Sequence, residues 1–367
     1  MKTSQYDVAV IGLGGMGSSV LAHCAKRGMR AIGFEQYQPL HDRGASSGRS
    51  RMIRKAYYEH PHYVPLLLRA YDAWRELERE SNSQLLYLTG LLMIGNDRSE
   101  VIAGALQSAA EYGLPVEQLG AMQVRERFPM FAIREGERAV YESDGGFIVP
   151  ETAIEAHLQI AQRYGAVAEF GTYVSAEQAI ERASNVVVCA GPWLEYLHLD
   201  VPLEIERNVQ HWFAPGTDRV AIGRCPAFLI ERDEWPYPLY GFPDYGFGVK
   251  AAFHGSGQIT HANDLEREVR EADIAPVRAA MDEALPRAAG PYIEGKACMY
   301  ALTPDRHFVI SPRTSDPRVI LAGGFSGHGF KFVPVVGEVI AAAIAGDSPE
   351  YEIGFLSAAR FAQERSR

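Results

Sequence analysis

Three glycines near the N-terminus have the type and spacing that suit phosphate binding. Gly12, Gly14 and Gly17 follow the apolar run Asp7–Ile11 at GxGxxG spacing. In this motif the first glycine allows a tight turn, the second lets the backbone approach a pyrophosphate, and the third permits close helix–strand packing. A helix that begins at about Gly15 would direct its free N–H groups and positive dipole end at the phosphates.

An acidic residue completes the pattern of a dinucleotide-binding unit. Glu35 follows a second predicted strand, Arg30–Phe34, about 20 residues beyond the first glycine. A carboxylate there can accept a hydrogen bond from a ribose 2′-OH, and it repels a 2′-phosphate. The unit therefore predicts a dinucleotide other than NADP. It leaves FAD and NAD open, and an ordinary glycine-rich turn is the competing interpretation.

Three basic residues, Arg51, Arg54 and Lys331, stand out by their spacing or their neighbours. Arg51 and Arg54 stand three apart, so on an extended-to-helical segment they could address neighbouring sites. A solvated basic face is the alternative. Lys331 lies between Phe330 and Phe332, which argues against a freely solvated side chain, although a lysine can snorkel from apolar surroundings.

Composition limits the classes of protein to which the chain can belong. It has 367 residues, 47% of them hydrophobic, a net charge of −10 and a pI near 5.6. This length predicts two domains or one large one. The acidic balance argues against a nucleic-acid partner, although a local basic cluster can still bind an anionic substrate.

The cysteines and the hydropathy point to a cytoplasmic protein. The four cysteines form no CxxC pair, so neither a zinc ribbon nor a thioredoxin-like motif is predicted, and no metal site is expected. Reduced thiols are typical of a chain of this size without a signal peptide. No run of 18 or more uncharged apolar residues predicts a membrane span.

The pattern of elements predicts an α/β protein of two domains. Buried parallel-type strands are expected at the start, middle and end of the chain, at Asp7–Ile11, Asn185–Ala190 and Val319–Ala322. Antiparallel-looking material lies between them. We therefore expect a discontinuous Rossmann-type domain from residues 1–80, 140–200 and 290–367, with an inserted substrate domain of mixed or antiparallel sheet from 81–139 and 201–289.

Helical periodicity and a possible strand pair complete this outline. Leu85–Ile94 looks like two strands around Thr89-Gly90. The predicted helices are Tyr63–Glu80, Glu100–Glu111, Glu151–Tyr164, Glu266–Leu285 and Val335–Ala345.

Five sequence blocks carry a family resemblance. They are VIGLGGMGSS, RGASSGRSRMIRKAYYE (Arg43–Glu59), YGFP with the downstream lysine and histidine (Tyr240–His254), KACMYALTPDRHFVI (Lys296–Ile310) and GGFSGHGFKFVPVVGE (Gly323–Glu338). Over nearly its full length the chain resembles the monomeric sarcosine oxidase family, which includes N-methyltryptophan oxidase and pipecolate oxidase. These are FAD-dependent amine oxidases of the D-amino-acid-oxidase-like group.

The resemblance implies FAD, attached through a thioether. Cys298 matches the cysteine that carries the flavin 8α-methyl group in the family. A buried structural cysteine is the alternative. The residues that the resemblance places on the cofactor are Gly12, Gly14, Gly17, Glu35, Ser50, Cys298, Gly327, Gly329 and Lys331.

It also implies the remaining site residues. Arg51 would lie beside the flavin, and Arg54 with Lys331 would hold the substrate carboxylate. Lys250 would activate O₂, because a cation stabilises the anion that forms when O₂ is reduced. Tyr240 and His254 would orient the amine and shape the pocket; a core tyrosine and a surface histidine are the alternatives.

The implied activity is oxidation of an N-methyl or cyclic α-amino acid to an imine, with O₂ reduced to H₂O₂ by a monomeric enzyme. An FAD amine dehydrogenase and a fructosyl-amino-acid oxidase remain alternatives within the enzymes. A non-catalytic flavin-binding protein is the alternative from another class.

The chain departs from the family pattern at three places. Ser46-Ser47 replaces a His–His pair, and Arg49 stands where an acid is common. Tyr240 and Lys250 are one residue closer than in sarcosine oxidase. Between Phe170 and Asn185 the usual hairpin is missing, and we expect a compact helical or irregular link over residues 176–183.

Overall fold

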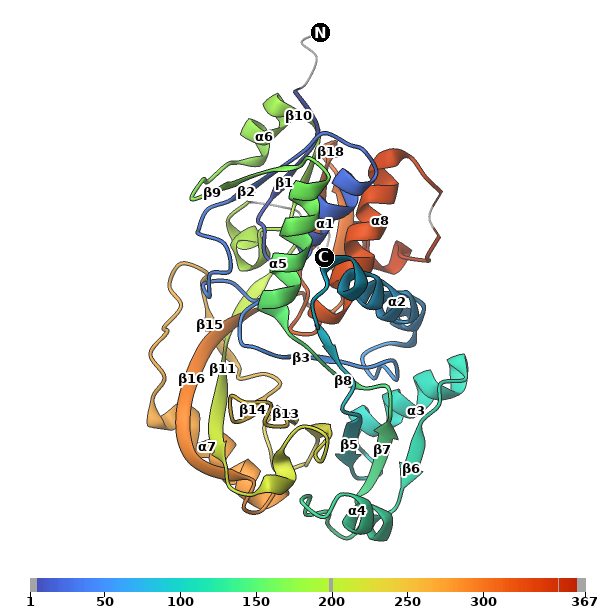
Figure 1. Ribbon diagram of the computed structural model, residues 1–367, viewed down its shortest axis with the longest axis vertical. Coiled ribbons are helices and arrows are strands. Elements are labelled where there is room, and N and C mark those ends of the chain that lie inside the picture. Colours follow the sequence, from blue (N-terminus) through green and yellow to red (C-terminus); the bar gives the residue numbers. More distant parts are fainter. Residues whose placement is uncertain (1–4, 198–200, 349, 362–367) are drawn as a thin grey trace.

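The computed structural model describes residues 5–197, 201–348 and 350–361, so the outermost residues of the expected segments lie outside it. Within these residues the strands form three sheets, of six, nine and three strands. Figure 1 shows two lobes, with the long strands β11 (Glu204–Pro215) and β16 (Ala289–Leu302) running side by side along the lower one.

The six-stranded sheet has the order β17-β18-β10-β1-β2-β9 among the described residues. All neighbours pair in parallel except β17, which joins β18 as an antiparallel edge. This is the sheet of a Rossmann-type domain, as the buried apolar runs predict. The bounds are β1 Tyr6–Ile11, β2 Ala31–Glu35, β9 Val167–Phe170, β10 Ala183–Val188, β17 Val309–Arg313 and β18 Asp316–Gly323.

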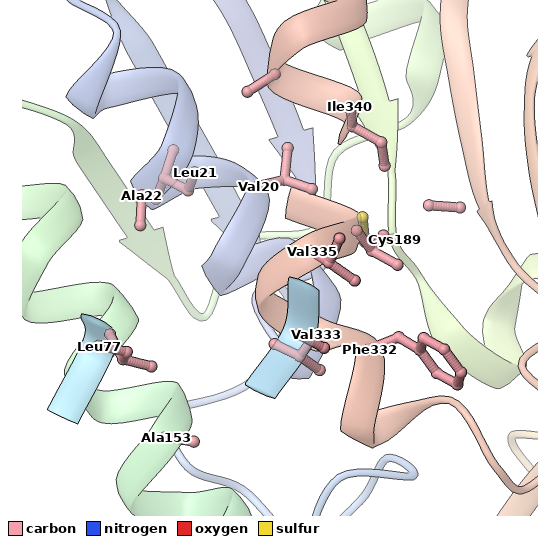
Figure 2. Close-up of a cluster of buried hydrophobic side chains, with 14 of the residues drawn as sticks. Val20, Leu21, Ala22, Leu77, Ala153, Cys189, Phe332, Val333, Val335 and Ile340 are labelled. Atoms are coloured by element: carbon pink, nitrogen blue, oxygen red, sulfur yellow. The ribbon is translucent and has the colours of Figure 1, made fainter. Parts of the chain in front are cut away.

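Helices cover both faces of this sheet because its side chains alternate. Val8 and Val10 pack with α1 (Gly15–Lys26), α2 (Val64–Ser81), α5 (Pro150–Arg163) and α8 (Val333–Ala345). Ala9 faces the other way and packs with α6 (Ala176–Arg182). Figure 2 shows part of the first core, with Val20 of α1 near Val335 and Ile340 of α8.

The start of α1 depends on two glycines. Gly12 turns the chain out of β1 with φ +85°, in the left-handed region that favours glycine. A Cβ on Gly17 would overlap the carbonyl oxygen of Gly12, so α1 packs against the turn at backbone distance. Gly28, with φ +79°, follows the helix end as predicted.

The large sheet presents two different faces. One packs on α7 (Glu271–Ala284) through apolar residues such as Phe228 and Met281. The other carries Tyr240, Phe242 and Lys250, since Tyr240 and Phe242 are two apart on β13 and Phe242 pairs with Lys250. The bounds of its remaining strands are β5 Leu91–Gly95, β6 Glu117–Leu119, β7 Arg138–Glu142, β12 Ala227–Ile230, β13 Leu239–Phe242, β14 Val249–Phe253 and β15 Gln258–Thr260.

A small sheet connects the two lobes. Its central strand is β8 (Gly146–Ile148), which pairs with β3 (Arg51–Ile53) on one side and β4 (Leu86–Tyr87) on the other. In Figure 1, β3 and β8 run between the upper and lower lobes. The segment that carries Arg51 therefore lies at the junction. Two further helices, α3 (Glu100–Tyr112) and α4 (Ala121–Arg127), lie in the lower lobe.

Most predicted elements are confirmed, and two are corrected. The link after Phe170 is the helix α6, which confirms the expected compact link, and it has a capping box between Ser175 and Gln178. The expected strand pair within Leu85–Ile94 is wrong: β4 and β5 belong to different sheets, because Gly90 (φ +76°) turns the chain away.

The helix expected from Glu266 begins only at Glu271. Arg207 binds the carbonyl oxygens of Glu266 and Glu268, at 2.8 and 2.9 Å, and so holds that stretch outside the helix. The boundaries between the two domains remain a proposal, in which β7 and β16 belong with the large sheet because they hydrogen-bond to it. No helix in the described residues has the length and apolar character to cross a membrane.

We expect Gly17→Ala to lower the free energy of unfolding by about 1–3 kcal/mol, because the new Cβ must push α1 away from the turn. Gly14→Ala is the matched control: its Cβ would have Ser46 Oγ as nearest neighbour, at 3.6 Å. Chemical denaturation of both variants measures the difference. Equal losses of stability would contradict the packing role of Gly17.

Candidate active site

A cavity of about 450 Å³ connects the N-terminus of α1 with the inner face of the large sheet. It brings together residues that are far apart in the sequence. The sequence-predicted residues that line it are Gly12, Gly14, Glu35, Ser50, Arg51, Arg54, Tyr240, His254, Gly327, Gly329 and Lys331. Gly17, Lys250 and Cys298 do not line the cavity. Gly17 packs behind the turn at Gly12, whereas Lys250 and Cys298 are hydrogen-bonded to residues of the cavity wall, Ser50 and Gln210.

The N-terminal turn of α1 opens onto this cavity. The position of a Cβ on Gly14 is free of close contacts, so a ligand can approach the backbone there. Ser46 Oγ accepts a hydrogen bond from the Gly15 N–H at 3.3 Å. One residue of the Ser46-Ser47 pair is therefore part of the helix entrance. This geometry suits a phosphate group.

Glu35 lies at the end of β2, buried and still lining the cavity. Its carboxylate accepts from the N–H groups of Leu13 at 2.9 Å and Tyr37 at 3.1 Å. Burial opposes ionisation, but the hydrogen bond and ion pair with His41 and these two N–H groups hold the pKa of Glu35 below its usual value. The acid is thus charged and fixed where the motif requires it.

The turn Gly48–Ser50 is held from both lobes. Lys250 Nζ donates to the carbonyl oxygens of Gly48 at 2.7 Å and Ser50 at 2.8 Å. From the other side, Glu151 on α5 accepts from the N–H groups of Gly48 at 2.7 Å and Arg49 at 3.1 Å. Gly48 and Arg49 both have positive φ, +112° and +64°. The hydrogen bonds with Lys250 and Glu151 stabilise a backbone conformation that residues other than glycine rarely adopt.

Lys250 is almost completely buried among aromatic rings. Its Nζ lies 5.3 Å from the ring centre of Trp212 and 5.2 Å from that of Phe242. Burial, together with the charge of Arg51, lowers the pKa of Lys250 well below its usual value. Two N–H groups of its Nζ donate to the turn Gly48–Ser50. Lys250 itself does not line the cavity, but Ser50 of this turn does.

Arg51 is fixed mainly by carbonyl groups. It donates to Ser50 O at 2.9 Å and Ala45 O at 3.0 Å, and it also bonds Ser47 O. A further donor reaches Gln210 Oε1 at 3.3 Å. The buried hydroxyl oxygens of Ser47 and Ser50 have no hydrogen-bond partner within the described part of the chain. Because buried polar atoms are normally satisfied, Ser50 on the cavity wall indicates a bound polar group.

Arg54 forms a buried ion pair with Glu59. The guanidinium also lies over the rings of Tyr57 and Tyr58, at 4.8 and 4.7 Å. Burial opposes the ionisation of Glu59, but the charge of Arg54 lowers its pKa to about 2. Arg54 Nε and Glu59 Oε1 have no partner in the described residues. The pair therefore keeps one donor and one acceptor free for a ligand.

Lys331 adds a second cationic group at this end. It is buried, and its Nζ donates to His328 O at 2.7 Å. Burial, reinforced by the charge of Arg54, lowers the pKa of Lys331 to about 7. With Glu59 as counter-ion, Arg54 and Lys331 leave an excess of positive charge below that pH, which suits a carboxylate.

Tyr240, His254 and Tyr300 form the neutral polar part of the wall. His254 Nδ1 lies 3.3 Å from Tyr300 OH. Burial lowers the pKa of His254 to about 4 and raises that of Tyr240 to about 12. At pH 7 these groups are therefore uncharged, and His254 is a weak base.

Cys298 lies on β16, buried, with its neighbours Met299 and Tyr300 on the cavity wall. Its Sγ accepts a hydrogen bond from Gln210 Nε2 at 3.1 Å. The thiol is thus connected to the cavity by its hydrogen bond to Gln210, whose side chain lines the wall. None of the four cysteines, all within the described residues, forms a disulfide.

Three site residues were missed in the sequence. Tyr300 stands two residues after Cys298 within a recognised block, and because the block lies on β16 the two residues share a face. Glu59 ends a recognised block, but nothing in the spacing indicates its pairing with Arg54. Gln210 belongs to no motif, and only the pairing of β11 with β16 brings it to the thiol.

Comparison with known proteins agrees with this geometry. The model of the DAO family, described as FAD dependent oxidoreductase, matches residues 7–343. The chain belongs to this family. Monomeric sarcosine oxidase of Streptomyces avermitilis is 38% identical over 97% of this chain and 98% of its own. N-methyl-L-tryptophan oxidase of Yersinia pestis is 32% identical over 97% and 99%.

Solved structures show the same fold. NikD, an unusual amino acid oxidase essential for nikkomycin biosynthesis, superposes in its open form with a TM-score of 0.83. That match covers 97% of this chain and 98% of NikD at 22% sequence identity. At this identity the likeness establishes the two-domain fold.

The cavity fits the FAD of the family. Its nucleotide end offers the open backbone at Gly14 and the charged Glu35, and its middle offers the unpartnered hydroxyl of Ser50. FAD, when bound, would take its phosphates at α1 and its ribose at Glu35. The end of the cavity that holds Arg54 and Lys331 is cationic and suits an anion.

We expect small carboxylates such as acetate to bind the holoenzyme with a pH dependence set by Lys331. The anion favours the protonated lysine, so affinity is full below about pH 7 and falls by up to about tenfold per pH unit above it. Titration followed by flavin absorbance between pH 6 and 9 measures this. In Lys331→Met the affinity should be weaker and flat with pH; an unchanged slope would assign the titration to another group.

Proposed function

We propose that the protein oxidises N-substituted α-amino acids, N-methyl or cyclic, to imines, with O₂ as the electron acceptor and H₂O₂ as the product. The observation that carries the proposal is the pair Arg54 and Lys331 at one end of a cavity whose other end has the features of an FAD site. FAD, when bound, supplies the redox chemistry by accepting the two electrons of the C–N oxidation. The protein supplies binding, orientation and electrostatics.

The carboxylate clamp orients the substrate. Arg54 has a free Nε donor, and its position is fixed by Glu59 and by two aromatic rings. Lys331 approaches from the segment after β18, so the carboxylate is bound from two sides. Fixing a reactant in this way removes orientational entropy from the reaction, with an effect of up to about 7–11 kcal/mol in ideal cases.

Apolar and neutral side chains surround the rest of the substrate. Met52, Tyr58, Leu229 and Phe242 line the cavity beside the clamp. Such a wall favours the uncharged form of an amine, because burial without a counter-ion opposes protonation. His254 and Tyr240 are neutral at pH 7 and can hydrogen-bond the amine without forming an ion pair. An apolar N-substituent fits this wall better than the polyhydroxylated chain of a fructosyl amino acid.

Lys250 is proposed to assist the reaction with O₂. It is a buried lysine of the inner sheet face, and the turn that it holds carries Ser50 and leads into Arg51. In its protonated form Lys250 would stabilise the negative charge that develops on O₂ during reduction. This role favours an oxidase over a dehydrogenase that uses another acceptor.

Covalent attachment through Cys298 is also part of the proposal. The buried thiol lies beside the cavity and is held by Gln210. The name of the sarcosine oxidase relatives supports a monomer. The free cysteines support a reducing, cytoplasmic location.

We expect Arg54→Met to reduce kcat/KM for the preferred N-methyl or cyclic amino acid by about 100-fold or more, because a buried charged hydrogen bond to the carboxylate is lost. The substrate is first identified by an anaerobic flavin-bleaching screen over N-methyl, cyclic and glycated amino acids. Arg98→Met, on the exposed surface, is the control. The double variant Arg54→Met/Glu59→Gln removes the uncompensated Glu59 charge and should recover part of the loss.

Two outcomes would contradict this assignment. An Arg54→Met enzyme with unchanged kcat/KM would remove Arg54 from the site. Failure of every tested amine to bleach the flavin would overturn the proposed activity and favour a non-catalytic flavin-binding protein.

We expect Lys250→Met to slow reoxidation of the reduced enzyme by O₂ far more than it slows reduction by substrate. Stopped-flow absorbance measures the two half-reactions separately. Lys296→Met is the matched control, because this lysine is on the same sheet but pairs with Asp42 at the surface. Equal slowing of both half-reactions would refute the oxygen role. H₂O₂ formation compared with dye reduction tests the acceptor itself.

A further inference from the structure

Gln210 forms hydrogen bonds to two groups of the site, Arg51 and Cys298. It lies on β11, 1% exposed, with its side chain on the cavity wall. Its Oε1 accepts from Arg51 Nη1 at 3.3 Å, and its Nε2 donates to Cys298 Sγ at 3.1 Å. Cys298 is its diagonal neighbour across the strand pair, since Asn208 pairs with Cys298 and Gln210 with Lys296.

The orientation of this carboxamide is determined by its neighbours. Arg51 has donors and no acceptor, so only the oxygen of Gln210 can face it. Arg51 is itself fixed by the carbonyl oxygens of Ala45, Ser47 and Ser50. The –NH₂ group must then point at the sulfur. The amide dipole of Gln210 is thus aligned between the two groups, with its negative end at Arg51 and its positive end at the Cys298 sulfur.

Gly48 keeps the amide in place. A Cβ at this position would overlap Gln210 Oε1, so the turn and the carboxamide pack in direct contact. The same turn is held by Lys250 and Glu151. The amide is therefore preorganised rather than free to rotate into the cavity.

The chemistry that needs such a donor is thioether formation. Attachment forms one S–C bond between Cys298 Sγ and the 8α-methyl carbon of the flavin, and it breaks one S–H and one C–H bond. The two protons and two electrons released are taken by O₂, which becomes H₂O₂. The thiolate is the nucleophilic form of cysteine, and an N–H donor or nearby cation favours it.

We propose that Gln210 is a positioning residue for covalent attachment of FAD: its carboxamide N–H holds the Cys298 sulfur in the orientation that attachment requires. This inference rests on the proposed attachment through Cys298 and is independent of which amine is oxidised. It is specific for the carboxamide, since a residue of equal size without an N–H cannot replace it.

The test uses the full-length chain produced under riboflavin limitation and mixed with FAD in air. Covalent attachment is followed by flavin fluorescence of the acid-precipitated, denatured polypeptide, with no amine substrate present. The variants are Gln210→Leu and Gln210→Glu, with Asn208→Leu as the control. Asn208 is another buried amide on the same face of β11, but it bonds Glu206 at 2.7 Å. Thermal unfolding and noncovalent FAD affinity are measured for each variant.

The expected order of attachment rates separates a polar role from packing. We expect Gln210→Leu to be slower than the parent by about tenfold or more, and Gln210→Glu to be slowest, because its carboxylate repels the thiolate. If Gln210 only filled space, the isosteric Glu variant would match the parent and the Leu variant would be worse.

Three results would overturn the inference. They are parent-like attachment in Gln210→Leu, a loss in Asn208→Leu as large as in Gln210→Leu, and a Glu variant faster than the Leu variant. A parent protein whose flavin stays in the acid supernatant would refute attachment through Cys298, and the role of Gln210 with it. Because no amine is used, failure of the proposed oxidase activity would leave this test unaffected.

Discussion

The turn Gly48–Ser50 is the constraint on which the site depends. Its backbone oxygens are held by Lys250 from the large sheet, and its N–H groups by Glu151 from the Rossmann-type domain. Tyr245 OH adds a bond to Arg49 O at 2.7 Å. The two lobes thus meet on one short segment with left-handed backbone, and β3 with Arg51 starts directly after it. A shift between the lobes would move Arg51 and Arg54 together.

Pairing of charges in the interior explains how the buried Lys250 can coexist with the cationic pair Arg54 and Lys331. Burying a charge is costly unless it is paired or hydrogen-bonded. Lys250 is compensated by two carbonyl oxygens and two aromatic rings, and Arg54 by Glu59 and two rings. Lys331 has one carbonyl partner and lies over the rings of Tyr57 and Phe332, and burial together with the charge of Arg54 lowers its pKa to about 7. A bound carboxylate would stabilise its protonated form.

The nucleotide half could be predicted from the sequence because its geometry is local. Gly12, Gly14, Gly17 and Glu35 lie within one strand–helix–strand unit, where turn sterics and strand length determine which atoms meet. The other half could be predicted only by resemblance. Arg54 and Lys331 come from segments nearly 280 positions apart, and periodicity says nothing about which distant strands pair. The same limit explains the wrong pairing of β4 with β5: a local turn signal at Gly90 was read as a hairpin, whereas each strand found its partner elsewhere.

Gln210 is an example of a residue whose contacts sequence motifs cannot predict. Cys298 is recognisable because its block is distinctive, but its proposed attachment to the flavin depends on what opposes it across β11 and β16, a strand pair with about 90 residues between its members. A valine or leucine at position 210 would satisfy strand propensity equally well. An amide in a buried strand is costly unless both ends are bonded, and here one end binds Arg51 and the other binds the sulfur. A buried polar residue that no motif predicts, with both ends used, therefore identifies a functional contact more sharply than the conspicuous cysteine beside it.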